Sequence, residues 1–220
     1  MTRPMTPSIT LPPIVVVATH NRGKAAEFAR MLGDDGVEWR DLSAFPDAGE
    51  VDETGHTFRA NACLKASEYA RRTGHWALAD DSGLEVDALG GKPGVVSARW
   101  AALHEAGSGD AANNALLLRQ LENTPDQERS ARFVCVLALA DSVGRIILTA
   151  RDTVEGRIIH QPRGTNGFGY DPLFEVESLG RTTAELTPAE KADVSHRGRA
   201  LRRLKALLAT TAAGETESLI

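Results

Sequence analysis

Residues 132–154 read RFVCVLALADSVGRIILTARDTV, and this stretch decides the class of fold. The apolar run Arg132–Ala140 predicts a long strand, and Arg145–Val154 predicts a second long strand that returns beside it. Asp141–Gly144, between them, has the composition of a turn, so the two strands form an antiparallel hairpin. A sheet that contains this hairpin is mixed rather than all parallel.

The N-terminal part of the chain begins a different kind of unit. Ile14–Ala18 is a short, apolar, β-branched run, typical of a strand buried on both faces, and Val37–Arg40 predicts another short strand. Between them, apolar residues recur at helical spacing from Ala25 to Leu32, before Gly33. Strand, loop and helix in this order start an α/β unit, so we predict an α/β fold in which helices flank a mixed sheet.

The rest of the chain predicts further helices and two more strands. Helices are expected over 57–72, over 110–121, after the capping box Thr187–Glu190 and after Ser195. Trp76–Ala79 and Leu84–Leu89 predict two strands, with a turn at Asp80–Gly83 between them.

The composition is that of a globular protein with a real core, because 42% of the 220 residues are hydrophobic and 25% are charged. Residues 1–13 contain four prolines, and we expect a disordered extension rather than a signal peptide. Residues 14–209 are expected to form a single domain, and 210–220 a frayed tail. No run approaches the roughly 20 apolar residues that span a membrane, so no membrane partner is expected.

Charge and cysteine content limit the partners and the compartment. The net charge of −5 argues against broad nucleic-acid binding, so a polyanionic ligand must meet a local cluster of cations. Cys63 lies in a helical pattern and Cys135 in an apolar strand, which favours free buried thiols over a disulfide or a metal site. Free thiols favour a reducing compartment, and we expect a cytoplasmic protein.

Asp80 and Asp81 follow an apolar run directly. Two adjacent carboxylates repel each other and are costly to desolvate, so a cation is expected to offset them. Mg²⁺ is the obvious candidate, since this hard cation favours carboxylate oxygen. The alternative for this dipeptide is a solvated acidic turn.

Lys65 is the second unusual residue. On the predicted helix it falls in one narrow arc with Phe58, Ala62 and Tyr69, near the middle of the apolar stripe. A lysine so placed favours an ammonium that is aimed into a cleft to meet phosphate. The alternative is a stem that packs on the core while the ammonium reaches water.

Three loops carry further candidate groups. Thr19-x-Asn21-x-x-Lys24 lies between the first strand and its helix, where backbone N–H groups and a lysine attract anions; it lacks the spacing of a Walker A loop. Its alternative is Asn21 as a helix cap with Lys24 exposed. Gly167–Pro172 places two aromatic residues among glycines, which suits stacking on a base or, alternatively, an ordinary tight loop.

Ser195–Gly198 stands at the start of the last helix. Its histidine and arginine can donate to carbonyl or phosphate oxygens, although a capped, solvent-facing helix end is the simpler interpretation. Taken together, the segments offer carboxylates, ammonium groups, a stacking loop and directional donors. A nucleoside triphosphate with Mg²⁺ requires this combination.

These segments resemble the inosine triphosphate pyrophosphatase family, which removes aberrant purine nucleotides. The likeness extends from about Ile14 to Leu208, and it is carried by Ala18–Lys24, Glu53–Phe58, Ala79–Leu84, Pro93–Arg99, Gly167–Phe174 and Ser195–Gly198. The resemblance implies a long, bent mixed sheet in two lobes with the substrate between them, and a homodimer. It also implies Mg²⁺-dependent hydrolysis of ITP, dITP and XTP to the monophosphate and pyrophosphate.

The same resemblance implies roles for individual residues. Asp81 matches the catalytic, metal-linked carboxylate, Glu53 a second metal carboxylate, and Asp80 a neighbour that helps to hold the ion. The implied substrate-binding residues are Thr19, His20, Asn21, Arg22, Gly23, Lys24, Lys65, Ser82, Phe168, Gly169, Tyr170, Asp171, Lys191, His196 and Arg197. Among these, the positions that match phosphate-binding residues are Thr19, Asn21, Lys24 and Lys65. The segment Phe168–Asp171 matches the base-side loop, and His196 and Arg197 match the residues that meet the base.

The sequence departs from the family at two positions. His20 stands where many members have glycine, so the approach of the backbone to the phosphates is expected to differ slightly. Ala60 stands where many bacterial members have glutamate, which removes one carboxylate near the metal. Two other functions stay open: a related pyrophosphatase that prefers pyrimidine or modified nucleotides, and a nucleotide sensor without catalysis.

Overall fold

The computed structural model describes residues 9–33 and 36–213. Most of the expected N-terminal extension, 1–13, and most of the expected tail, 210–220, lie outside the described residues. The last helix ends at Ala213, within the segment that was expected to be the tail.

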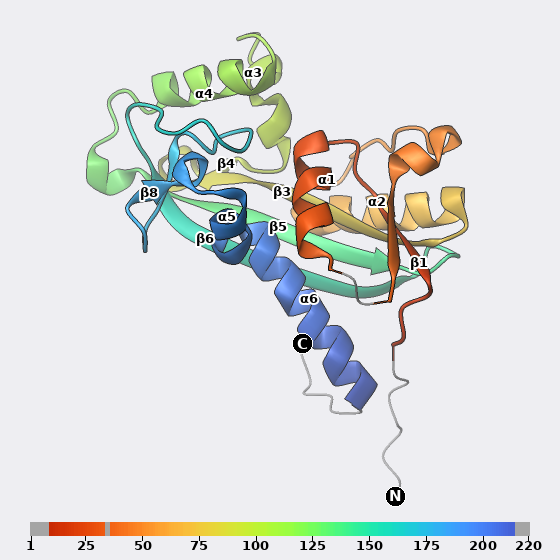
Figure 1. The fold of residues 1–220 in the computed structure, drawn as a ribbon. Helices are drawn as coiled ribbons and strands as arrows, with labels where there is room; N and C mark the ends of the chain where they lie inside the picture. Colours follow the sequence, from red (N-terminus) through yellow and green to blue (C-terminus); the bar gives the residue numbers. More distant parts are fainter. Residues whose placement is uncertain (1–8, 34–35, 214–220) are drawn as a thin grey trace, which may run out of the picture.

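One mixed sheet passes through the described part of the chain (Figure 1). Its strands are β1 (Ile14–Val17), β2 (Glu38–Asp41), β3 (Trp76–Val86), β4 (Lys92–Pro93), β5 (Ser130–Ala140), β6 (Ile146–Ile158), β7 (Phe174–Val176) and β8 (Arg181–Thr182). They lie in the order β2-β1-β3-β5-β6-β7-β8, and β4 pairs with β3 outside this path. Strand β1 is parallel to β2 and β3, and the other pairs are antiparallel, so the predicted mixed sheet and its hairpin are confirmed.

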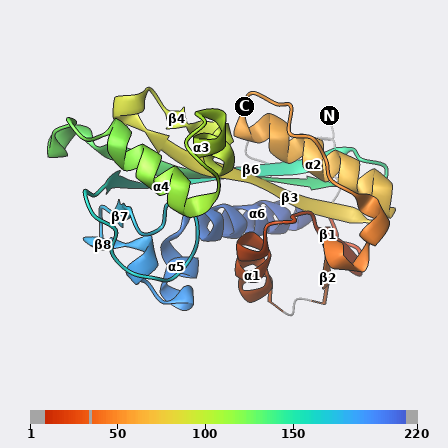
Figure 2. The same cartoon turned by 90° about the horizontal axis from the view of Figure 1, so that it is seen from above.

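Helices cover both faces of this sheet. They are α1 (Arg22–Met31), α2 (Phe58–Thr73), α3 (Trp100–Leu103), α4 (Gly109–Gln120), α5 (Pro188–Val194) and α6 (His196–Ala213). Figure 2 shows α2 on one side of the sheet and α6 with α1 on the other. The capping box at Thr187 is confirmed, and the Ser195 hydroxyl caps α6 by accepting from the Gly198 amide at 3.1 Å.

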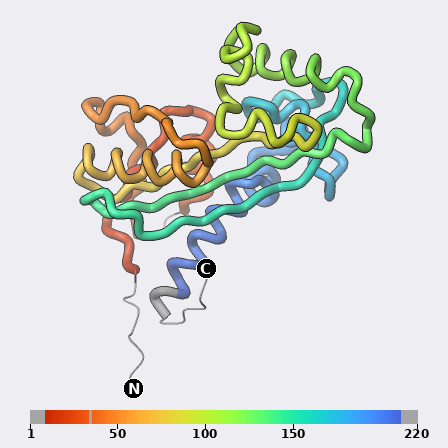
Figure 3. The backbone as a smooth tube through the Cα atoms, turned by 180° about the vertical axis from the view of Figure 1, so that it is seen from behind, coloured from red at the N-terminus to blue at the C-terminus, as the bar shows by residue number. Residues whose placement is uncertain are grey.

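The core is divided between the two ends of the sheet. At one end α2 packs on Ala77 and Ala79, while α1 and α6 pack on the opposite face around Leu78. At the other end α4 packs with β5, β6 and β7 around Leu84 and Phe133. Strands β5 and β6 are long enough to serve both ends, and Figure 3 shows them crossing the molecule.

The prediction of two strands with a turn at Asp80–Gly83 was wrong. Strand β3 continues for 11 residues through the acidic pair, because Asp80 pairs with Leu137 of β5 and Asp81 with Val136. Gly83 lies within the strand, where a Cβ would come within 2.4 Å of the Gly94 carbonyl oxygen. The expected second strand ends at Val86, and a 3₁₀ turn follows over Asp87–Leu89.

Several short helices and strands were not predicted from the sequence. The expected loop after Leu89 contains the two-residue β4, and α3 follows soon after it; β7 and β8 are three and two residues long. Such short segments carry too few residues to show a period. Cys63 and Cys135 are both free, as predicted, but only Cys135 is buried, and Cys63 is partly exposed. Among the described residues, no helix has the length and apolar character needed to cross a membrane.

Candidate active site

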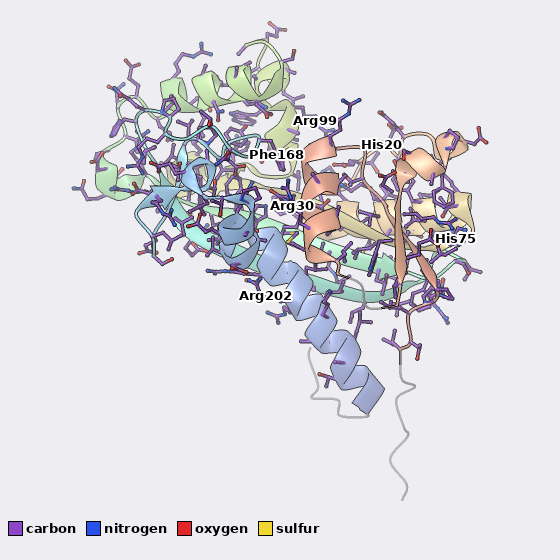
Figure 4. The ribbon with its side chains drawn as sticks, in the orientation of Figure 1. His20, Arg30, His75, Arg99, Phe168 and Arg202 are labelled. Carbon is purple, nitrogen blue, oxygen red and sulfur yellow. The ribbon has the colours of Figure 1, made fainter. Side chains whose placement is uncertain are left out.

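A cavity of about 310 Å³ lies between the two ends of the sheet, and both ends line it. The candidate residues that line it are Thr19, His20, Asn21, Lys24, Glu53, Lys65, Asp81, Ser82, Phe168, Gly169, Tyr170, Asp171, Lys191, His196 and Arg197. In Figure 4, Phe168 and His20 lie to either side of the N-terminal end of α1. Arg22, Gly23 and Asp80 do not line the cavity.

The acidic pair is split by the pleat of β3. Successive side chains of a strand point to opposite faces, so Asp81 faces α2 while Asp80 faces α1 and α6. Only 4% of Asp81 and 1% of Asp80 is exposed, which is far from the solvated acidic turn that the sequence also allowed. The two carboxylates therefore have separate partners rather than one shared cation.

Asp81 belongs to a cluster on the α2 side. The Lys65 ammonium lies 3.1 Å from Asp81 Oδ1 and 2.7 Å from Glu53 Oε1, so it bridges the two carboxylates. Asn61 Nδ2 donates to the other oxygen of Asp81 at 3.3 Å. Burial raises the pKa of Asp81 above its ordinary value, even though Lys65 opposes this. Burial disfavours the charged form of Lys65, but Asp81 and its acidic neighbours raise the pKa of the ammonium.

Asp80 belongs to a different cluster, which lies under α1 and α6. Its Oδ2 atom lies 3.0 Å from the Lys24 ammonium and 3.1 Å from Arg197 Nη2, and it accepts from the Ser82 hydroxyl at 2.8 Å. Burial opposes ionisation, yet Lys24 and Arg197 hold the pKa of Asp80 far below its ordinary value. Asp80 is therefore a permanent counter-ion for the two cations.

Glu27 of α1 extends this network toward the far side of the cavity. It pairs with Arg197 and, at 2.7 Å, with the Lys191 ammonium, which also lies 2.5 Å from Asp171 Oδ2. Burial would raise the pKa of Glu27, but Arg197 and Lys191 lower it. Glu27, which the sequence analysis did not identify, therefore joins Lys191 to Arg197, and Lys191 in turn holds Asp171.

The loop before α1 both caps the helix and presents a lysine to the cavity, the two alternatives that the sequence left open. Asn21 is the helix cap, since its side chain accepts from the Lys24 amide at 3.0 Å. The Lys24 side chain is only 14% exposed, however, and its ammonium faces the cavity and Asp80. The helix cap and the buried cation are compatible.

The aromatic loop is fixed by the neighbouring elements. Gly169 donates its amide to Asp110 Oδ2 of α4 at 2.7 Å, and the Tyr170 hydroxyl donates to the Ser97 carbonyl oxygen at 2.9 Å. The Phe168 ring packs on the start of α1, where a Cβ on Gly23 would lie 2.5 Å from it. The Lys191 ammonium lies 4.9 Å from the centroid of the same ring.

His196 and Arg197 are buried, so the interpretation as a solvent-facing helix end was wrong. The His196 ring stacks on Phe133 with 4.8 Å between the centroids. Burial lowers the pKa of His196 well below its ordinary value, and the positive charges of Arg197 and Lys191 act in the same direction. The imidazole is therefore neutral at pH 7, with one nitrogen that donates and one that accepts.

The carboxylates that face the cavity fit a hard divalent cation that keeps other ligands. Glu53 and Asp81 already share one cationic group, which shows that their oxygens converge. Within the described residues, no three His, Cys, Asp or Glu side chains gather closely enough to hold an ion by themselves. Mg²⁺ suits such a site, because it is usually held by one or two carboxylates together with water and substrate phosphates.

The lining or supporting residues that the sequence analysis missed as functional candidates include Glu27, Asp110 and Tyr69. Glu27 and Asp110 act through partners far away in the chain, so no local pattern marks them. Tyr69 was assigned to the apolar stripe, but it also lines the cavity next to Lys65. The only signal for Tyr69 was its position one helical turn after the lysine.

Comparisons with known proteins agree in family and in fold. The sequence model of the Ham1 family matches residues 15–207. A protein of Exiguobacterium sibiricum named dITP/XTP pyrophosphatase is 55% identical over 89% of this chain and 97% of its own length. One of the same name from Geobacillus kaustophilus is 50% identical over 86% of this chain and 91% of its own length.

A solved structure of a HAM1 protein from Coxiella burnetii superposes with a TM-score of 0.79. It is 42% identical, and the match covers 89% of this chain and 98% of the other. The likeness therefore extends over nearly the whole described fold, including the segments that line the cavity.

Proposed function

Because the chain belongs to the Ham1 family, we propose that it hydrolyses the triphosphates of aberrant purines, ITP, dITP and XTP, to the monophosphate and pyrophosphate. The observation that carries this proposal is the cluster of Asp81, Lys65 and Glu53 at the wall of a nucleotide-sized cavity. A protein that only binds nucleotides gains little from two carboxylates beside a polyanion. This cluster therefore favours an enzyme over a sensor.

The phosphates are expected to lie between Thr19–Lys24 and Lys65. The backbone at the start of α1 and the ammonium groups of Lys24 and Lys65 balance the charge of the triphosphate. Because both lysines are paired with carboxylates, they are held in place before the substrate arrives. Phosphoryl transfer depends mainly on positioning and on charge stabilisation, which these residues supply.

Asp81 is the proposed proton acceptor for the attacking water. Lys65 and Asn61 contact its two oxygens and so fix the orientation of the carboxylate that would accept the proton. A water that loses its proton to Asp81 would attack the α-phosphorus in line with the departing pyrophosphate. We propose that Glu53 and Asp81 also hold Mg²⁺, which would neutralise phosphate charge when bound. Asp80 serves as the counter-ion of Lys24 and Arg197.

The base is expected between Phe168 and the donors of α6. Hypoxanthine and xanthine carry a 6-oxo group, which accepts from the Arg197 guanidinium, from His196 or from a backbone amide. Adenine carries an amine there and would leave a buried donor unpaired, which is costly. A preference for 6-oxo purines over ATP follows.

Two further properties are proposed. The free thiols of Cys63 and Cys135 suit the cytoplasm. The homodimer that the family resemblance implies is tested by sedimentation of the purified chain.

Pyrophosphate release is the test of the reaction. The full chain is incubated with ITP and Mg²⁺, and pyrophosphate and orthophosphate are measured separately. Pyrophosphate in a one-to-one ratio with IMP supports the proposal. Orthophosphate alone, or tight binding of ITP without any product, would contradict it.

A further inference from the structure

The segment that carries Glu53 has no regular structure of its own among the described residues. Gly49–Gly55 follows a 3₁₀ turn that ends at Ala48, and it forms neither helix nor strand. Gly49 has φ 61° and ψ −172°, a conformation that is essentially restricted to glycine. Something outside the segment must therefore hold Glu53 at the cavity wall.

Side chains of other elements form hydrogen bonds with the backbone carbonyl groups of this segment. Arg72 Nη1 donates to the Ala48 carbonyl at 2.7 Å and to the Glu50 carbonyl at 2.9 Å. Between these two, the Gly49 carbonyl oxygen lies 3.1 Å from His20 Nε2. Three consecutive carbonyl groups are thus bound by side chains rather than by a neighbouring strand.

Most of the contacts that hold this segment come from residues on one face of α2. Lys65, Tyr69 and Arg72 are spaced i, i+4 and i+7, so they share one face of the helix. Lys65 contacts Glu53, Tyr69 belongs to the apolar cluster against which Val51 packs, and Arg72 holds the carbonyls on either side of Gly49. The segment therefore runs antiparallel to α2, with Arg72 at one end and the catalytic cluster at the other.

We propose that Arg72 is a positioning residue that sets the register of 48–53 against α2 and thereby places the Glu53 carboxylate beside Asp81. Arg72 suits this task because one guanidinium nitrogen reaches two carbonyl groups and its charge is permanent. His20 supports the same segment from the phosphate loop, which gives this residue a structural task besides any contact with substrate. The consequence for catalysis rests on the proposed function. The attachment of residues 48–50 to α2 by Arg72, called the tether below, does not.

The test compares Arg72→Met with Arg71→Met in the full chain. Arg72→Met keeps an apolar stem and removes the donors. The control removes the neighbouring arginine, which pairs with Glu68 at 2.7 Å and is half exposed. Hydrogen exchange of the Gly55 amide, which donates to Asn61 Oδ1 of α2 at 2.7 Å, is measured without nucleotide; it is expected to accelerate roughly tenfold in Arg72→Met and to stay unchanged in the control. Unchanged exchange in Arg72→Met would overturn the tether.

The functional consequence is read from the Mg²⁺ dependence of binding. The Mg²⁺ concentration for half-maximal binding of a non-hydrolysable ITP analogue, measured by calorimetry, is expected to rise roughly tenfold in Arg72→Met. In a Glu53→Gln background the same change should have no further effect, because Arg72 acts through Glu53. An equal effect in both backgrounds, or a wild-type Mg²⁺ dependence in Arg72→Met, would overturn the positioning role.

A conservative variant guards against misfolding. Arg72→Lys keeps a donor near the carbonyl groups and is expected to restore most of the exchange protection and the Mg²⁺ dependence. Circular dichroism shows whether Arg72→Met is folded. If it is unfolded, Arg72→Lys decides instead: an exchange rate in Arg72→Lys that is no faster than in the wild type would count against the proposal. A wild-type chain that does not hydrolyse ITP would overturn the proposed function and the catalytic consequence, while the exchange experiment would still decide the tether.

Discussion

Asp81 and its neighbour Asp80 show how much two adjacent residues can differ. Both are buried aspartates, but Asp81 has a raised pKa and shares Lys65 with Glu53, whereas Asp80 is held ionised by Lys24 and Arg197. The pleat of β3 alone separates them. One is suited to accept a proton, and the other to hold cations in place.

Replacement of Asp81 by asparagine tests the first of these roles. Asp81→Asn keeps the shape and the contact with Asn61 but removes the base, so turnover of ITP should fall by about 10²-fold or more while the fold is retained. Steady-state kinetics and circular dichroism measure the two effects. Near-normal turnover by this variant would remove Asp81 from the mechanism.

Replacement of Asp80 should act on stability instead. Asp80→Asn leaves the buried cations Lys24 and Arg197 without their shared counter-ion, and breaking a buried ion pair typically costs about 3–5 kcal/mol. Urea denaturation should show a loss of this order in the free energy of unfolding. A variant as stable as the wild type would show that the Asp80 pairs contribute little.

His196 makes stability depend on pH. Its folded-state pKa lies below the ordinary value of 6.5, so at a pH between the two values the unfolded chain binds more protons. This contribution to stability is complete above pH 6.5 and is lost progressively as the pH falls below it. The slope of unfolding free energy against pH, from about pH 7 to about pH 5, should therefore be flatter in His196→Gln than in the wild type. Equal slopes would contradict a buried neutral imidazole.

At the scale of elements, β3 is the clearest case of tertiary structure overriding a local pattern. Asp-Asp-Ser-Gly has the composition of a turn, yet it forms part of a strand, because β5 pairs with β3 along this segment. The two carboxylates can be buried there because each forms an ion pair with a lysine. The hairpin of β5 and β6 was predictable, since its two apolar runs carry their own signal. Helices α2 and α4 were predictable from the helical spacing of their apolar residues, and α5 from its capping box.

The close packing of β3 against the segment after β4 gives a prediction at this scale. In Gly83→Ala the new methyl group would lie 2.4 Å from the Gly94 carbonyl oxygen and 2.5 Å from Ser97 Oγ, so overpacking should cost about 1–3 kcal/mol. Gly33→Ala is the matched control, because nothing lies within 4 Å of its added methyl group. Thermal unfolding of both variants makes the comparison. Equal melting temperatures would show that β3 can shift at no cost.

At the scale of the whole molecule, the cavity is assembled from segments between Ala18 and Arg197. Most of its lining was predictable, because each segment carries a local motif and the resemblance joins the motifs into one site. The links between the segments were not predictable. Glu27 joins α1 to α5 and α6, and Asp110 joins α4 to the aromatic loop, and both depend on neighbours that only the fold brings close.

This cavity is proposed to select the triphosphates of hypoxanthine and xanthine and to hydrolyse them. The most direct test is kcat/KM for ITP, XTP, GTP and ATP, measured with Mg²⁺ on one preparation of the full chain. The proposed site predicts clear preference for ITP and XTP over ATP, and pyrophosphate as the product in each case. A flat profile across the four nucleotides, or a preference for ATP, would contradict it.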